Sequence, residues 1–227
     1  MPLFIDIHTH QLTVEENGLR IHNLAVNQPG FCADEYFRIY HTERFFSAGI
    51  HPWFLQRELV GKGMEILENL LENQQILMVG ECGLDRIVSI DFEFQKEVFI
   101  RQILLAEKLQ KPLIIHCVRA FPELIAIKKR LNVKVPMIVH GFNNNLQICE
   151  QLVKNQFYIS LGAALLNPGS NASKAVCTVP LNQLFLETDD KNCTISSIFA
   201  VTSEYLGLSI EDLQEAIAQN FRKITEI

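Results

Sequence analysis

Short apolar segments with strand-like composition alternate along this chain with segments whose apolar residues recur at helical spacing. This alternation is typical of βαβ units, in which helices join parallel strands. The predicted strands are Leu3–Ile7, Leu19–Ala25, Arg44–Gly49, Ile76–Gly80, Pro112–His116, Met137–His140, Phe157–Ser160 and Leu184–Glu187. The pattern therefore predicts an α/β fold, a (β/α)8 TIM-like barrel.

The length of the chain predicts a compact version of this barrel. At 227 residues it is slightly shorter than the ~250 residues of a typical (β/α)8 barrel. The stretch Thr13–Tyr40 contains the turn sequences Asn17-Gly18 and Asn27–Gly30 where the first full helix should stand. We therefore expect a truncated first βα unit. Without a repeat or a Pro-, Gly- or Ser-rich linker, residues 1–227 should form a single domain.

Clear helical patterns follow most of the predicted strands. They cover Gly63–Asn73, Phe92–Leu109, Pro122–Leu131, Asn145–Asn155 and a last helix from Ser209. Ser209 with Asp212 has the spacing of a capping box, which predicts where the last helix begins.

Charge and composition exclude several classes of protein. A net charge of −6 argues against a protein that coats nucleic acid, because that mode requires a strongly basic face. No apolar run reaches the ~20 residues of a membrane-spanning helix, and the amino terminus leads directly into a predicted strand without a basic leader. We therefore expect a cytoplasmic protein that does not bind membranes. The six cysteines form no CxxC pair, so we expect them to be reduced.

The sequence Asp6-Ile7-His8-Thr9-His10 at the end of the first predicted strand is chemically the most informative. Alternate residues of a strand point to the same side, so Asp6, His8 and His10 should face one way. Two imidazoles there can bind a cation, and the aspartate can orient them. Taken alone, the motif fits two packed histidines equally well.

Further metal-ligand residues stand where other predicted strands end: Glu81, His116, His140 and Asp189. In a (β/α)8 barrel these strand ends converge on the catalytic face. Imidazole and carboxylate donors in this ratio suit Zn²⁺, Mn²⁺ or Fe²⁺ better than Mg²⁺. The pattern therefore predicts a metal centre, and a pair of cations would support hydrolysis of a phosphodiester or an amide.

The order of these motifs resembles that of the TatD-type metal-dependent deoxyribonucleases, over nearly the whole chain. The segments that carry the resemblance are Ile5–His10, Gly49–Pro52, Val79–Asp85, Pro112–Ala120, Val139–Phe142 and Leu186–Asp189. The resemblance implies two divalent metal ions, with Mg, Mn and Zn as the candidates. It assigns the first ion to His8, His10, Glu81 and Asp189, and the second to Glu81, His116 and His140.

The resemblance also implies catalytic and substrate-binding roles. Glu81 would bridge the two ions, and Asp189 would act as the base that orients the attacking water. His51 and Arg119 would contact the phosphate. The substrate would be DNA or another phosphodiester, and no obligate protein partner is expected.

The chain departs from the TatD pattern only in loops. Arg86 replaces an aromatic residue, Gly141–Asn144 replaces a Cys-Phe-Ser-Gly run, and Asp190-Lys191 replaces Ala-Pro. Because loops select substrates while strand ends hold metals, hydrolysis is better supported than DNA as the substrate.

Three functions remain open at this point. The first is an end-acting deoxyribonuclease, and the second is an amidohydrolase that cleaves a C–N or lactone bond. The third is a non-catalytic, partner-binding protein on the same fold. Glu81 at the bridging position, where amidohydrolases often carry a modified lysine, favours phosphodiester cleavage. The roles of five further residues also remain open. Asp85 and Glu187 could form a turn, pack in the barrel or orient a ligand, and Trp53 could pack under a loop or stack on a base. Arg86 and Lys191 could contact the substrate or be solvated charges.

Overall fold

The computed structural model of the protein describes residues 4–11, 18–39 and 45–225. These residues fall into two compact units. Unit 1 contains residues 1–22 and 138–227, and unit 2 contains residues 23–137. That residues 1–227 form a single domain stays a prediction.

Each predicted strand is present in the structure. The strands are β1 (Phe4–Thr9), β2 (Gly18–Ala25), β3 (Phe45–Gly49), β4 (Ile76–Asp85), β5 (Leu113–Val118), β6 (Met137–Val139), β7 (Tyr158–Leu161) and β8 (Leu184–Leu186). They form one eight-stranded sheet in chain order, from β1 to β8. Within unit 1, a parallel bridge between Thr9 and Asp189 joins the end of β1 to the residues after β8. This topology confirms the predicted (β/α)8 barrel class.

Helices follow the strands largely as predicted. They are α1 (Ala33–Ile39), α2 (Val60–Leu71), α3 (Phe92–Leu109), α4 (Phe121–Leu131), α5 (Leu146–Lys154), α6 (Asn171–Ala175), α7 (Ile195–Leu206) and α8 (Ile210–Thr225). Short 3-10 helices are η1 (Pro52–Phe54), η2 (Ala163–Leu166), η3 (Val176–Thr178) and η4 (Leu181–Gln183). The Ser209 hydroxyl accepts a hydrogen bond from the Asp212 amide at 3.0 Å, so the predicted cap begins α8.

The first βα unit is truncated, as the sequence predicts. Residues 10–17 join β1 to β2, whereas parallel strands are ordinarily joined by a dozen residues or more. The first helix, α1, follows β2 and has only seven residues. Among the described residues, no helix combines the length and the apolar composition of a membrane span.

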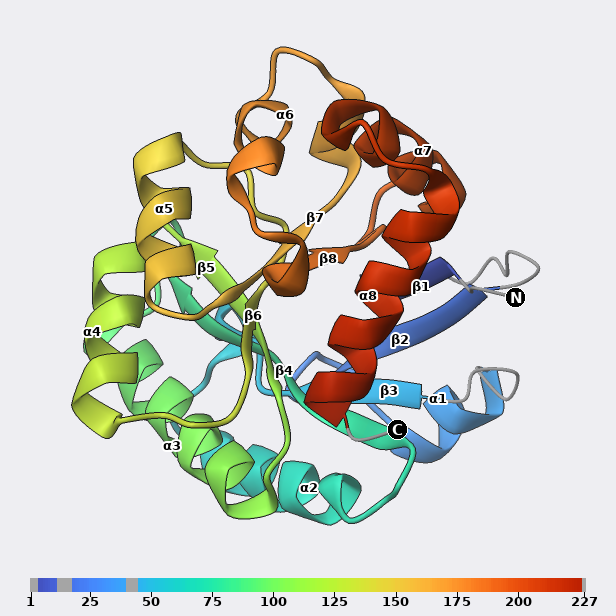
Figure 1. The fold of residues 1–227 in the computed structure, drawn as a ribbon. Coiled ribbons are helices and arrows are strands. Elements are labelled where there is room, and N and C mark those ends of the chain that lie inside the picture. Colours follow the sequence, from blue (N-terminus) through green and yellow to red (C-terminus); the bar gives the residue numbers. More distant parts are fainter. Residues whose placement is uncertain (1–3, 12–17, 40–44, 226–227) are drawn as a thin grey trace. The chain divides into compact units, whose positions relative to one another are not determined.

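In unit 2, helices α2, α3 and α4 pack on strands β3, β4 and β5 (Figure 1). Helix α3 also holds the ends of two strands through buried glutamines. The Gln102 side chain bonds to the amide and the carbonyl of Ile50 at 2.7 and 3.1 Å. The Gln95 side chain does the same for Asp85, at 2.8 and 2.9 Å. These bonds fix the backbone directly beside His51 and at the carboxyl end of β4.

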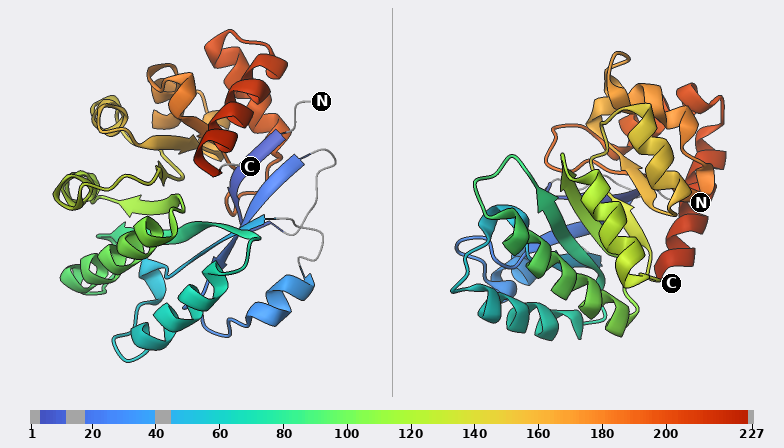
Figure 2. Two further views of the ribbon diagram at one scale, coloured as in Figure 1. Left: turned by 60° about the horizontal axis from the view of Figure 1, so that its bottom comes forward. Right: turned by 90° about the vertical axis from the view of Figure 1, so that its left-hand side faces the viewer.

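In unit 1, helices α7 and α8 pack on β1 and β8, and α5 packs on β7 (Figure 2). The amphipathic helix α8 buries Leu213, Ile217 and Phe221 at helical spacing. The Asn220 amide donates to the carbonyl of Leu184 at 2.9 Å, so α8 is tied to β8 by a buried polar contact as well. This packing supports the strand ends that carry His8 and Asp189.

Candidate metal centre

Glycines in β4 allow the strand to lie unusually close to β5. A Cβ atom at Gly80 would lie 2.4 Å from the Ile114 carbonyl oxygen, and one at Gly83 would lie 2.0 Å from that of His116. Both glycines have φ near +150°, a backbone angle that residues other than glycine rarely adopt. Because β4 can approach β5 here, Glu81 is brought next to His116.

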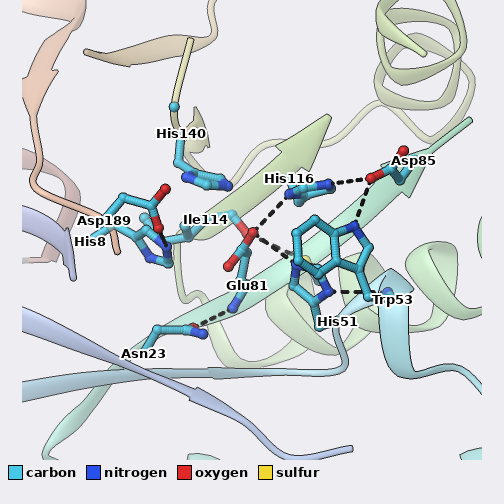
Figure 3. A network of polar contacts seen from close by, with 12 residues as sticks. His8, Asn23, His51, Trp53, Glu81, Asp85, Ile114, His116, His140 and Asp189 are labelled. Carbon is cyan, nitrogen blue, oxygen red and sulfur yellow. Dashed lines mark hydrogen bonds and ion pairs between the residues drawn. The ribbon is translucent and has the colours of Figure 1, made fainter. Parts of the chain in front are cut away.

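In unit 2, a candidate ligand group centres on the Glu81 carboxylate. Its Oε1 atom lies 3.0 Å from Nε2 of His51 and 2.9 Å from Nδ1 of His116 (Figure 3). All three residues are buried. One ligand atom from each residue lies within 4.8 Å of the other two, which is close enough for all three to reach one ion. The Glu81 amide donates to Asn23 Oδ1 at 2.6 Å, and this bond fixes the backbone that carries the carboxylate.

Asp85 orients the imidazole of His116. Its Oδ2 accepts hydrogen bonds from His116 Nε2 at 2.9 Å and from the Trp53 indole at 2.7 Å. Burial raises the pKa of Asp85, but the hydrogen bonds from His116, Trp53 and Ile87 outweigh it and lower the pKa to about 2. The ionised carboxylate holds the proton of His116 on Nε2, so in the neutral ring the Nδ1 lone pair faces Glu81.

This tautomer provides a test of whether a cation fits. With the proton on Nε2, Nδ1 of His116 and Oε1 of Glu81 are two acceptors only 2.9 Å apart. Such a contact is satisfied by a second proton on the imidazole ring, or by a metal ion that both the imidazole nitrogen and the carboxylate oxygen bind. The donor set fits a divalent cation.

His51 presents the opposite ring atom to Glu81. Its Nδ1 accepts a hydrogen bond from the Trp53 amide at 3.1 Å, so in the neutral ring the proton lies on Nε2 and points at Glu81. The Asn27 side chain holds the His51 backbone, accepting from its amide at 2.8 Å and donating to its carbonyl at 2.9 Å. In the neutral rings, His51 therefore presents an N–H donor to Glu81, whereas His116 presents a lone pair that could bind a cation.

In unit 1, candidate ligands stand at the ends of strands β1, β6 and β8. Oδ1 of Asp189 lies 3.6 Å from Nε2 of His8 and 3.7 Å from Nε2 of His10. The ring of His140 lies 4.5 Å from that of His8, centroid to centroid. His8, His140 and Asp189 each offer one ligand atom within 4.8 Å of the others, so they form a second candidate ligand group. Their side chains are shown in Figure 3.

Backbone and carboxylate contacts hold the unit 1 ligands in place. The Asp189 amide donates to the His8 carbonyl at 3.0 Å. Both carboxylate oxygens of Asp6 accept hydrogen bonds from Thr188, at 3.0 and 2.6 Å, so Asp6 fixes the segment that carries Asp189. Burial is the main reason that the pKa of Asp6 is raised to about 7. Glu187 Oε1 lies 3.3 Å from Nδ1 of His140, which is where a group that orients this ring should lie.

Comparison with known proteins identifies the family. The family described as TatD related DNase matches residues 32–226 of the chain. The chain belongs to the TatD family. It is 26% identical over 227 residues to the uncharacterized metal-dependent hydrolase YjjV of Escherichia coli, covering 92% of this chain and 82% of that protein. It is also 26% identical to the putative deoxyribonuclease TATDN3 of the mouse, over 72% of this chain and 61% of that protein.

Solved structures of TatD proteins share the fold. The crystal structure of E. coli YjjV matches with a TM-score of 0.81 and 23% identity, over 99% of this chain and 98% of that one. A TatD family hydrolase from Entamoeba histolytica matches with a TM-score of 0.79 and 15% identity, over 98% of both chains. At these identities the likeness establishes the barrel fold.

The loop residues that depart from the TatD pattern make local contacts. Arg86 pairs with Glu123 at 2.5 Å and stacks over the Phe92 ring at 3.8 Å. Lys191 pairs with Asp190 at 2.6 Å. Arg119, predicted to contact phosphate, is exposed directly after β5 and has a left-handed backbone with φ of 53°.

The ion assignments that the TatD resemblance implies stay predictions, while ligand atoms of several of these residues lie close together within each unit. The resemblance assigns His140 to the second ion with His116, and His51 to the substrate. The structure groups His140 with His8 and Asp189 in unit 1, and His51 with Glu81 and His116 in unit 2. Whether Glu81 bridges two ions stays a prediction.

Two orienting carboxylates were left open by the sequence. Asp85 is four residues after Glu81 in β4, so strand alternation predicts that both lie on one face of the strand. Glu187 and Asp189 follow the end of β8, and Asp189 has a positive φ, so their placement depends on the tertiary structure. For Asp85, this spacing was the signal that the sequence offered. His22 lies outside both groups and is buried in β2, where burial is the main cause that lowers its pKa to about 3. His41 is outside the described residues.

Proposed function

We propose that this TatD family protein is a metal-dependent phosphodiesterase that cleaves nucleotides from an end of DNA. The observation that carries the proposal is that each unit holds candidate ligands close together: ligand atoms of His8, His140 and Asp189 within 4.8 Å in unit 1, and Glu81 and His116 at 2.9 Å in unit 2. Buried acids and imidazoles are costly unless they are paired or coordinate a metal. Their position at strand ends of a (β/α)8 barrel is where such enzymes carry their chemistry.

The proposed ligands are divided between the two units. In unit 1, His8, His10, His140 and Asp189 would hold one ion. In unit 2, Glu81 and His116 would hold the other, with Asp85 orienting the imidazole. Nitrogen-rich donor sets of this kind favour Zn²⁺ or Mn²⁺ over Mg²⁺. Bound divalent ions would supply Lewis-acid activation of the phosphate and lower the pKa of water.

The protein's own residues would position the substrate and move the proton. Asp189, whose side chain is 28% exposed, would accept the proton of the attacking water. His51 would donate its Nε2 proton as a hydrogen bond to a phosphate oxygen, which is the role that its Nδ1 contact with the Trp53 amide supports. Arg119 would bind a non-bridging phosphate oxygen.

The charge of the protein supports action at an end of DNA. A net charge of −6 gives little counterion release, so the enzyme would bind long DNA weakly. Metal ions and a few positioned donors are sufficient to hold one terminal phosphodiester. We therefore propose an end-acting enzyme.

The test is hydrolysis by protein that has been stripped with EDTA and reloaded with Zn²⁺, Mn²⁺ or Mg²⁺. Substrates are bis-p-nitrophenyl phosphate and single-stranded oligonucleotides labelled at either end. We expect activity only after reloading, with products shortened from one end. Full activity in excess EDTA would refute the metal mechanism.

A pair of neighbouring aspartates provides the matched variants. Asp189→Asn should retain the fold and lower kcat by orders of magnitude, because the amide cannot accept the proton. Asp190→Asn makes the same change in an exposed side chain paired with Lys191, and should retain full activity. If Asp189→Asn turns over within twofold of wild type, Asp189 is not the base.

The same metal-reloaded protein, assayed also on lactones and hydantoins, distinguishes the amidohydrolase and the non-catalytic function. Cleavage of lactones or hydantoins without cleavage of phosphodiesters would identify an amidohydrolase. Metal-loaded protein that hydrolyses none of these substrates would favour a non-catalytic role.

A further inference from the structure

Trp53 is the only tryptophan in the sequence, and it lies beside the unit 2 ligands. It belongs to the short helix η1, two residues after His51. Its ring meets those of His51 and His116 nearly at right angles, with centroids 5.0 and 5.6 Å away and interplanar angles of 81° (Figure 3). An aromatic surface therefore borders His51, proposed to contact the phosphate, and His116, proposed to hold an ion.

The side chain is exposed and yet fixed in position. Trp53 is 53% exposed, so it does not serve mainly as a packing residue under the loop. Its indole N–H donates to Oδ2 of the buried Asp85 at 2.7 Å, and its backbone amide donates to Nδ1 of His51 at 3.1 Å. Both donors are therefore engaged by the site. A fixed, exposed aromatic surface can bind a planar ligand with little further loss of conformational entropy.

We propose that Trp53 is a stacking platform for a nucleobase next to the scissile phosphate. This inference rests on the proposed function and specifies how its substrate is held. Stacking on an aromatic side chain tolerates every base, because each base has a π-face. Since the indole N–H is engaged by Asp85, Trp53 cannot use it to distinguish one base from another. The subsite therefore binds bases without selecting among them.

Tryptophan fluorescence tests the proposal without any turnover. Because Trp53 is the only tryptophan, all indole emission reports on this subsite. The protein is titrated in Mg²⁺ with thymidine and deoxyadenosine monophosphates, which contain no cleavable phosphodiester, and with 2-deoxyribose 5-phosphate, which lacks a base. We expect saturable quenching by both nucleotides and none by the sugar phosphate. Equal quenching by the sugar phosphate, which has no base, would overturn the proposal. Absence of quenching by all three compounds would also overturn it.

A cycle of enzyme and substrate changes tests the same contact kinetically. Trp53→Phe retains an aromatic face and removes the indole N–H, whereas Trp53→Leu removes both. Each variant is assayed on oligonucleotides with natural terminal nucleotides and on matched oligonucleotides whose two terminal nucleotides are abasic. For Trp53→Leu we expect KM to rise roughly 5- to 150-fold on the natural substrate and to change little on the abasic one. Trp53→Phe should retain most of the affinity for the natural substrate.

The control is Leu104→Ala, which alters an equally exposed apolar residue on α3 and should leave both KM values unchanged. If Trp53→Leu impairs both substrates equally, Trp53 acts only through Asp85 and the stacking proposal is wrong. Failure of the proposed function looks different. In that case the wild type hydrolyses no phosphodiester, while the fluorescence titration still decides whether the base binds Trp53.

Discussion

Replacement of Asp85 by asparagine tests how far metal binding depends on the residue that orients His116. The Asp85 carboxylate accepts three hydrogen bonds, from His116 Nε2 at 2.9 Å, the Trp53 indole at 2.7 Å and the Ile87 amide at 2.8 Å. Asparagine has a single acceptor oxygen. In either orientation of the amide, its NH2 group therefore faces at least one N–H donor.

The magnitude follows from the bonds that are lost. If the NH2 group faces His116 and Trp53, the imidazole loses the acceptor that holds its proton on Nε2. The His116 ring can then carry its proton on Nδ1, the atom that faces Glu81, where the proton would block binding of a cation. Losing an orienting carboxylate typically reduces metal affinity about 10- to 100-fold, which corresponds to roughly 1.4–2.7 kcal/mol. We expect Asp85→Asn to raise the dissociation constant of the unit 2 ion by this factor.

The assay is competition with a chromophoric chelator, using protein first stripped of metal. Asp91→Asn is the matched control, because Asp91 Oδ1 accepts a hydrogen bond from the Phe94 amide at 2.9 Å at the start of α3. Asparagine caps helices about as well as aspartate, so this control should bind metal like the wild type. A folded Asp85→Asn protein with a dissociation constant within twofold of wild type would refute the orienting role.

Two further changes test the strand geometry and the phosphate contact. Gly83→Ala would place a Cβ atom 2.0 Å from the His116 carbonyl oxygen, and we expect it to lower the free energy of unfolding in urea by more than about 2 kcal/mol. Gly61→Ala, in helix α2 with nothing within 4 Å of the added Cβ, should instead raise it by roughly 0.4–1 kcal/mol; equal effects would contradict the close approach of β4 and β5. Arg119→Ala should raise KM for a phosphodiester more than for a neutral ester in steady-state assays, and equal increases would remove Arg119 from the phosphate site.

The positions of the strands could be predicted because they depend on local patterns. Apolar runs and helical spacing are properties of neighbouring residues, and the predicted strands agree with the structure closely at most boundaries. The main discrepancy is β4, which was predicted to end at Gly80 but continues to Asp85. Glycine is ordinarily unfavourable in strands, so the sequence suggested an end where the structure uses Gly83 for a close approach to His116.

Helix α7 was not predicted, although α8 was. Helix α8 has a recognisable cap at Ser209 and one continuous apolar stripe. Helix α7 (Ile195–Leu206) mixes serine and threonine with apolar residues, and its sequence shows a weaker periodicity. Helix α7 buries Ile195, Ile198 and Phe199 and packs on β1 and β8, so tertiary packing stabilises a helix that its local sequence indicates only weakly.

The fold class and the residue types at the strand ends could be predicted from the amino-acid sequence, because both follow from short-range periodicity and from motif order. Which side chains meet depends on the three-dimensional fold. It pairs His140 with His8, engages Arg86 with Glu123, and fixes the indole of Trp53 on Asp85. The physical reason is that ligation and hydrogen bonding depend on distances accurate to tenths of an ångström between residues far apart in the chain. No local pattern of side chains specifies such distances.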